Sequence, residues 1–135
     1  MTKIFKRISA VAMAAAMATT MAISANAEGE TGKFMGYSYD AKVTANPDTH
    51  TQTAYTFYDN LRADVYTGMQ VQNAKFGTVI DSAPRTGRSG TNKTATVKLY
   101  VKDSPITAFS SHEIIPPSSD DEPWYRYFED FYVVQ

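Results

Sequence analysis

The stretch TATVKLYV, residues 94–101, decides the fold class because its apolar and polar residues alternate without a break. Four apolar residues share one side of this stretch, and these are Ala95, Val97, Leu99 and Val101. The other side carries Thr94, Thr96, Lys98 and Tyr100. A period of two is typical of a β-strand with one buried face, whereas a helix would mix the two sets. We therefore predict a half-buried strand here.

The segments on both sides of this stretch repeat the pattern. In 61–72 one face carries Leu61, Ala63, Val65, Met69 and Val71. Further candidate strands are 33–45, 52–58, 75–81 and 106–115, separated by turn residues such as those of Asp81-Ser82-Ala83-Pro84. Six or seven short strands predict an all-β fold, either a small antiparallel β-sandwich or a compact barrel.

The first 27 residues have the three parts of a secretory signal peptide. Lys3, Lys6 and Arg7 precede an apolar run over 8–23, and Ala25-Asn26-Ala27 follows it. The run is shorter than the roughly 20 apolar residues that a membrane span needs. We expect cleavage after Ala27 and secretion of a single β-domain, residues 28–135, that is not an integral membrane protein.

The chain contains no cysteine, which excludes disulfides, thiolate metal sites and a cysteine nucleophile. Small exported domains of animals usually depend on disulfides, so this chain is typical of a bacterial source. Without the 3 basic residues of the leader, 10 basic and 14 acidic residues remain, a net charge of −4. This charge gives no indication of a nucleic-acid partner.

The basic segment 82–93 is predicted to be a mobile hairpin loop. Its glycines do not have the spacing of a phosphate-binding loop, and a strand rather than a helix follows it. Arg85, Arg88 and Lys93 are candidates for loose contact with an anionic polymer of the cell envelope. The alternative is that they are solvated charges.

No catalytic motif is present, and we predict that the protein is not an enzyme. Its two histidines are His50, in a turn, and His112, in the strand candidate 106–115. No serine lies in a nucleophile elbow, so His112 is only the first residue to test if a hydrolase is considered. The histidines are not paired at the spacing of metal ligands, and we expect no metal and no cofactor.

The segment 122–135, EPWYRYFEDFYVVQ, admits two secondary structures. A helix would line up Trp124, Tyr127, Phe128 and Phe131 in one stripe. A strand would turn Tyr125, Tyr127, Phe131 and Val133 to the core, and Trp124, Phe128 and Tyr132 to the outside. The aromatic enrichment favours the strand.

These outward aromatics, together with Tyr37 and Tyr39, form the candidate binding surface, although such rows also occur as cross-strand pairs that stabilise a sheet. We predict a non-enzymatic binding protein for an extracellular protein, a glycan or an envelope component. One alternative follows from the size and composition of the chain. As a small, cysteine-free, aromatic-rich β-protein with an export signal, it broadly resembles some Sec-secreted bacteriocins. A small hydrolase is the third hypothesis.

Overall fold

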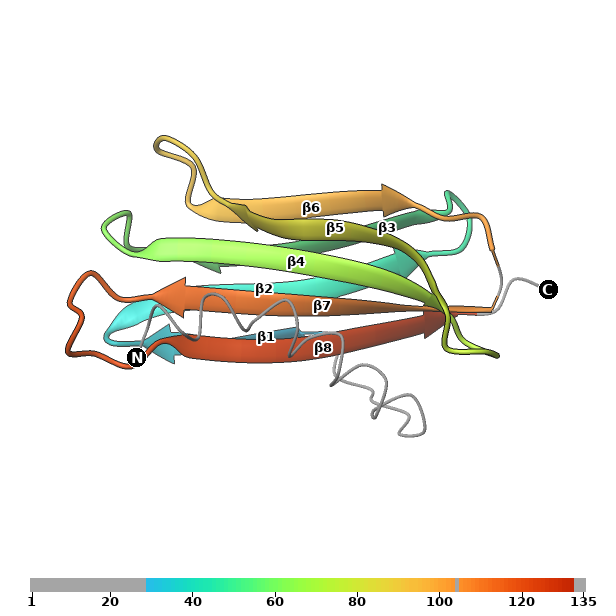
Figure 1. Cartoon of the computed structure of the whole chain (residues 1–135). Coiled ribbons are helices and arrows are strands. Elements are labelled where there is room, and N and C mark those ends of the chain that lie inside the picture. Colours follow the sequence, from blue (N-terminus) through green and yellow to red (C-terminus); the bar gives the residue numbers. More distant parts are fainter. Residues whose placement is uncertain (1–28, 104, 133–135) are drawn as a thin grey trace.

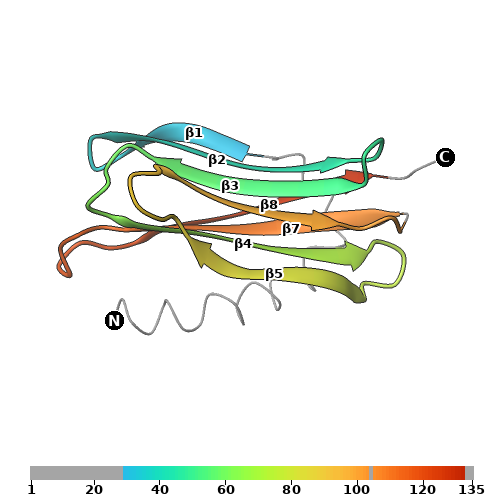
Figure 2. The same ribbon diagram turned by 90° about the horizontal axis from the view of Figure 1, so that it is seen from above.

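A computed structural model describes residues 29–103 and 105–132, which form two packed antiparallel sheets (Figures 1 and 2). The strands are β1 (Gly29–Phe34), β2 (Tyr37–Asn46), β3 (Thr51–Tyr58), β4 (Asp64–Asn73), β5 (Val79–Gly87), β6 (Thr94–Tyr100), β7 (Ile106–Ile115) and β8 (Trp124–Tyr132). One sheet has the order β1-β2-β3-β6 and the other the order β5-β4-β7-β8. The all-β prediction is confirmed, with eight strands rather than six or seven. The predicted signal peptide lies outside the described residues.

The chain crosses between the sheets three times, after β3, β5 and β6. Such crossings are typical of Greek-key sandwiches, in which neighbours in space are often distant in sequence. No helix in the described ranges is long and apolar enough to cross a membrane.

The core confirms the alternation from which the fold was predicted. Ala95 and Val97 of β6 are buried, and Val65, Met69 and Val71 of β4 meet them from the other sheet. Leu61 is an exception: it was expected on the buried face, but it precedes β4 and is 47% exposed. Ala63 also precedes β4 yet is only 4% exposed, so in the segment before this strand the alternation is right for Ala63 and wrong for Leu61.

The candidate strand 33–45 is in fact a hairpin of β1 and β2. Phe34 pairs with Tyr37 across the two-residue turn Met35-Gly36, and both turn residues have positive φ, 51° and 83°. Two such residues make the tight turn whose twist suits a hairpin. Methionine is uncommon at positive φ, so the sequence carries no strong signal for this turn.

The expected turn Asp81-Ser82-Ala83-Pro84 is also wrong, because all four residues belong to β5. The pairing of β5 with β4 shifts register between Thr67 and Met69, whose partners are Thr86 and Ala83. Pro84 lies in this bulge on an edge strand, and edges and bulges are where a strand tolerates a residue without an amide hydrogen. The predicted hairpin loop is accordingly shorter than 82–93.

The C-terminal segment forms strand β8, as favoured, but its expected facing is wrong. Trp124 and Phe128 are buried in the core, whereas Tyr127 and Phe131 lie on the outer face. The inward side of β8 also holds Arg126 and Asp130, and these two charges are the reason why the sequence favoured the opposite facing. Because β8 is an edge strand, both side chains reach past the edge: Arg126 binds Glu30, and Asp130 accepts a hydrogen bond from the amide of Ala45 at 2.7 Å.

Candidate functional site

A polar and aromatic cluster lies on the outer face of the β5-β4-β7-β8 sheet, and each strand contributes one residue. Tyr66 comes from β4, Arg85 from β5, Glu113 from β7 and Tyr125 from β8. The register places Glu113 directly between Tyr66 and Tyr125. We call these four residues the outer-face cluster.

Arg85 holds the outer-face cluster together. Its Nε donates to Oε1 of Glu113 at 2.7 Å, and its Nη2 lies 2.5 Å from the same oxygen. Its guanidinium carbon lies 3.3 Å from the centroid of the Tyr66 ring, which is a cation–π contact. Gly68 of β4 lies beside Arg85: a Cβ there would come within 3.7 Å of the Arg85 backbone and within 2.8 Å of Oγ of Ser111.

Burial and the nearby carboxylate of Glu113 raise the pKa of the Tyr125 hydroxyl, and the same two causes raise the pKa of Tyr127. Both phenols therefore stay protonated at neutral pH. Neither hydroxyl serves as a base, whereas each is able to donate a hydrogen bond.

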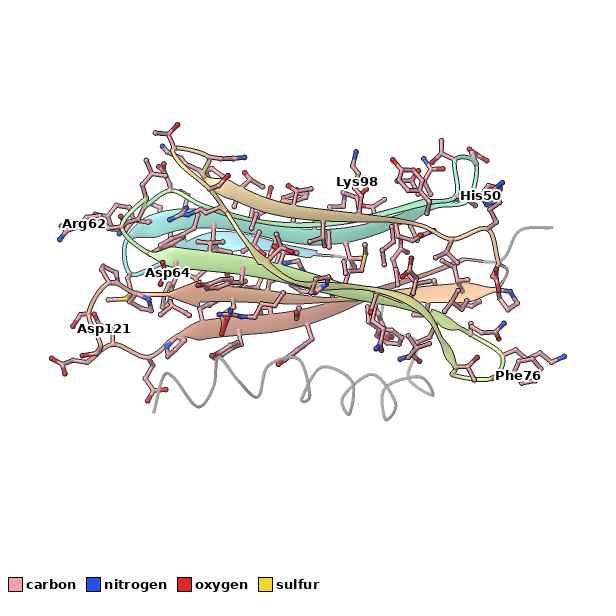
Figure 3. The ribbon with its side chains drawn as sticks, turned by 45° about the horizontal axis from the view of Figure 1, so that its top comes forward. His50, Arg62, Asp64, Phe76, Lys98 and Asp121 are labelled. Atoms are coloured by element: carbon pink, nitrogen blue, oxygen red, sulfur yellow. The ribbon has the colours of Figure 1, made fainter. Side chains whose placement is uncertain are left out.

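The same face of this sheet also carries exposed apolar side chains, which extend from beside the outer-face cluster to the opposite end of the strands. Phe131 of β8 is 57% exposed, and its row across the sheet continues through Thr107 and Gln72 to Val79, which is 53% exposed. Phe76, in the β4–β5 hairpin, is 70% exposed and projects at the tip (Figure 3). With the half-exposed Tyr127, these side chains form what we call the apolar end: Phe76, Val79, Tyr127 and Phe131.

The structure does not bring the predicted aromatic surface together. Trp124, Phe128 and Tyr39 are buried, and the rings of Trp124 and Tyr39 lie 4.7 Å apart inside the sandwich. Tyr37 is exposed but packs edge-on against Tyr58. The side chain of Tyr132 lies outside the described part of the structure, and this residue pairs with Ile106 in β7.

The three predicted anion-binding residues each have a partner inside the protein. Arg85 binds Glu113, and Lys93 lies 2.5 Å from Oδ1 of Asp59. The guanidinium of Arg88 donates to four backbone carbonyls, those of Tyr58, Asn60, Ala63 and Lys93. The segment is therefore braced against the β3–β4 loop rather than displayed as a free basic loop.

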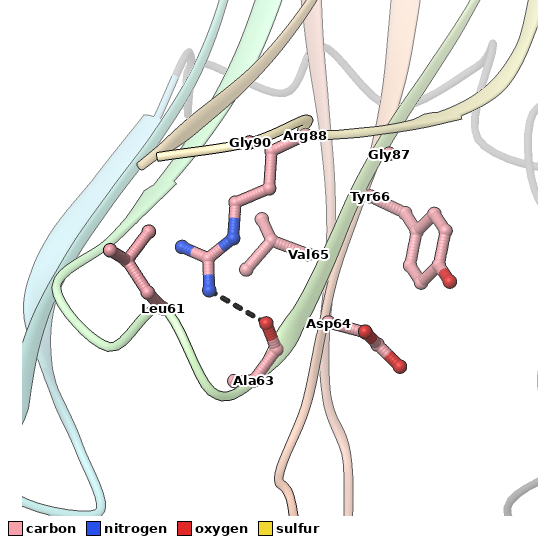
Figure 4. Close-up of a pocket in the computed structure, with 8 residues that line it drawn as sticks. All are labelled: Leu61, Ala63, Asp64, Val65, Tyr66, Gly87, Arg88 and Gly90. Carbon is pink, nitrogen blue, oxygen red and sulfur yellow. Dashed lines mark hydrogen bonds between the residues drawn. The ribbon is translucent and has the colours of Figure 1, made fainter. Parts of the chain in front are cut away.

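A small hollow adjoins Arg88 and is shown in Figure 4, where its bond to the carbonyl of Ala63 is dashed. Its lining residues are Leu61, Ala63, Asp64, Val65, Tyr66, Gly87, Arg88 and Gly90. Its volume of about 140 Å³ is the space of a few water molecules, well below that of a typical small-molecule site. Burial lowers the pKa of Arg88, and the charge of Asp64 opposes this effect. We assign the hollow to the bracing of the two loops.

His112 is buried in the core within a chain of hydroxyl groups. Its Nε2 lies 2.6 Å from Oγ of Ser110, and its Nδ1 lies 2.7 Å from Oγ1 of Thr56. Thr56 lies 2.7 Å from Oγ1 of Thr67, which donates to the carbonyl of Ala95. The one proton of Thr67 goes to the carbonyl of Ala95, so Thr56 donates to Thr67, with the carbonyl of Tyr66 as a second acceptor at 3.3 Å. Its proton is thereby committed, and Thr56 must accept from Nδ1 of His112. Nδ1 therefore carries the proton, and Nε2 accepts from Ser110.

This chain explains His112 as a core residue. The side chains of Ser110, His112, Thr56 and Thr67 are all less than 2% exposed, so a substrate has no path to them in this structure. Burial lowers the pKa of His112 to about 3, which keeps the ring neutral at physiological pH. His50 lies apart from it, in the β2–β3 turn, at a positive φ of 55°.

Sequence reasoning did not identify Tyr66 and Glu113 as members of a cluster. The alternation predicts the face of each residue but not which strands are neighbours, and the pairing of β4 with β7 joins segments about 40 residues apart. Within the described ranges no group of three or more His, Asp or Glu side chains is placed to hold a metal ion.

Comparison with known proteins adds no relative: no known protein family, no curated protein and no solved structure matches the chain.

Proposed function

We propose that the protein is a non-enzymatic binding domain that works outside the cell and contacts a protein partner through the apolar end. The exposure of Phe131 carries the proposal: a phenylalanine that is 57% exposed on a strand face costs solvation free energy unless a partner covers it. Val79 and Tyr127 are exposed on the same face as Phe131, and Phe76 is exposed in the hairpin that precedes Val79. The features of a signal peptide in residues 1–27 support secretion, and the absence of cysteine supports a bacterial source.

The composition of this face suits protein recognition. Exposed apolar patches rimmed by polar groups commonly mark contact surfaces, and aromatic residues and arginine are enriched among the residues that dominate binding energy. The outer-face cluster supplies such a rim, with Arg85 already held in place by Glu113 and Tyr66. A preorganised side chain loses less conformational entropy when a partner binds.

The test compares matched aromatic variants. Proteins that the immobilised chain captures from an envelope extract are purified and titrated with the wild type, with the double variant Tyr127→Ala/Phe131→Ala and with Tyr100→Ala. Tyr100 is the control because it is 71% exposed on the opposite sheet. We expect the double variant to weaken binding about tenfold or more and the control to leave it unchanged. Equal affinities of the double variant and the wild type would contradict the proposal.

A further inference from the structure

The outer face of the β1-β2-β3-β6 sheet differs in chemistry from the face discussed above. Alternate residues of β2 and β3 point away from the core, as do those of β1 and β6. The one hydrocarbon side chain that these four strands place on this outer face is Phe57. Six of its residues are threonines, namely Thr31, Thr44, Thr51, Thr53, Thr94 and Thr96. It also presents the lysines Lys33, Lys42 and Lys98. Figure 3 shows Lys98 projecting away from the sandwich.

These lysines stand opposite neutral residues. The cross-strand partner of Lys33 is Ser38, and that of Lys98 is Thr53. Within the described residues none of the three ammonium groups makes an ion pair. Opposite-charge pairs are the usual way in which neighbouring strands stabilise a polar face, and their absence leaves positive charge uncompensated.

The one acidic residue that the four strands place on this face is Asp40, and it already has a partner. The hydroxyl of Tyr55 donates to Oδ2 of Asp40 at 3.0 Å. This bond fixes the Tyr55 ring, which is half-buried, at the centre of the face. The face as a whole therefore has three cations against one anion, together with many hydroxyl donors.

The register puts this ring between two of the lysines. Tyr55 lies directly opposite Lys42, and Lys98 is its diagonal neighbour through the Thr53 pair. Direct and diagonal cross-strand neighbours have Cβ atoms about 5 and about 7 Å apart, so a sugar ring stacked on Tyr55 would lie within reach of both lysines. Tyr100 lies two residues beyond Lys98 on β6, and it is 71% exposed.

From this placement we propose that the outer face of β1-β2-β3-β6 binds an acidic polysaccharide, with Tyr55 and Tyr100 stacking on sugar rings and Lys42 and Lys98 pairing with the carboxylates of the sugars. A planar apolar ring with a hydroxyl suits the face of a sugar, and ammonium groups supply charge that complements a polyanion. The threonine hydroxyls bind the hydroxyl groups of the polymer. The site is independent of the proposed function, because it lies on the opposite sheet.

The experiment titrates the purified protein with polygalacturonate, with neutral dextran and with poly(glycerol phosphate), which carries charge but no sugar ring. We expect binding to polygalacturonate alone, and a loss of affinity when salt is raised from about 0.05 to about 0.5 M, because salt screens exposed charges. Lys42→Gln/Lys98→Gln should weaken binding about tenfold, and Tyr100→Ala severalfold. Circular dichroism of each variant verifies that it is folded.

The matched control is Lys75→Gln, which removes one exposed lysine from the β4–β5 hairpin and should change affinity less than about twofold. Absence of binding to polygalacturonate would overturn the proposal. Equal binding of poly(glycerol phosphate) would reduce the site to a general polyanion surface and overturn the role of the rings. If Lys42→Gln/Lys98→Gln and Lys75→Gln reduced the affinity for polygalacturonate equally, the placement of the site on the outer face of β1-β2-β3-β6 would be overturned. The double variant Tyr127→Ala/Phe131→Ala should bind polygalacturonate as tightly as the wild type does. This expectation holds whether or not the same variant weakens binding to a captured protein partner.

Discussion

Nδ1 of His112 lies 2.7 Å from Oγ1 of Thr56, and this bond joins the two sheets at the centre of the sandwich. The two residues belong to β7 and β3, which are far apart in sequence. The bond is one member of a buried chain of hydrogen bonds that runs from Ser110 through His112 and Thr56 to Thr67. The elements around it contribute Thr56, Thr67, Ser110, the ring of Phe128 and the backbone of Tyr55. Burial lowers the pKa of His112, the backbone hydrogen bond with Tyr55 acts against this, and none of these side chains is charged.

The first prediction concerns pH. The pKa of His112 is about 3 when folded and about 6.5 when unfolded, so the unfolded chain binds more protons between these values. The contribution of His112 to stability is therefore constant above pH 6.5, and it makes the protein less stable as the pH drops from 6.5 toward 3. The free energy of unfolding should fall by at most about 1.4 kcal/mol per pH unit because of His112. Urea unfolding at a series of pH values in this range measures the change.

The control is His112→Gln, which cannot titrate. The clearest range is pH 6.5 to 4.5, because the carboxyl of Glu30 has an ordinary value of 4.5 that its bond from Tyr39 lowers further. In this range the free energy of unfolding of the variant should no longer depend on pH, even if that free energy is lower than in the wild type. A wild-type slope that persists in His112→Gln would show that other groups cause it.

The second prediction concerns the aromatic core of β8. Trp124→Ala should destabilise the protein by about 3 to 5 kcal/mol, because it leaves a cavity beside Tyr39 and removes a ring contact. Phe131→Ala, on the same strand but 57% exposed, should cost less than about 1 kcal/mol. Urea unfolding is followed by circular dichroism for both variants. Tryptophan fluorescence is unsuitable, because Trp124→Ala removes the one tryptophan of the chain. Similar losses for the two variants would mean that the facing of β8 is not as described.

The third prediction concerns the brace formed by Arg88. Arg88→Lys keeps the charge but replaces a planar group that serves four carbonyls by one ammonium group, and it should cost about 1 to 3 kcal/mol. Hydrogen exchange should rise at Asn60–Ala63 and in the loop before β6. Arg62→Lys, at an exposed position, is the matched control and should change stability by less than about 0.5 kcal/mol. Unchanged exchange in Arg88→Lys would refute the bracing role.

The sequence predicted the fold class and most strands because the alternation of 94–101 and its neighbours is a local property. A strand with one buried face carries that pattern in its own residues. The turn at Met35-Gly36 and the bulge at Pro84 were missed because methionine is an unusual residue at positive φ and proline usually ends a strand. Both exceptions are tolerated next to sheet edges.

The candidate site could be predicted only in part. Alternation placed Tyr127 and Phe131 together on one face of β8, yet it assigned that face to the core because the other face holds Arg126 and Asp130. The position of β8 at a sheet edge reverses the assignment, since edge residues reach solvent and polar partners from the inward side. Strand order is a property of the whole chain, and no window of residues contains it.

The sequence by itself determined that the chain forms half-buried strands and that it has no thiol chemistry, and it favoured a strand over a helix for the C-terminal aromatics. Only the tertiary structure decided which side of that strand is buried, that Arg85 meets Glu113, and that His112 bonds Thr56 inside the core. The physical reason is that hydrophobic alternation acts over a few residues, whereas ion pairs and buried hydrogen bonds depend on which strands become neighbours.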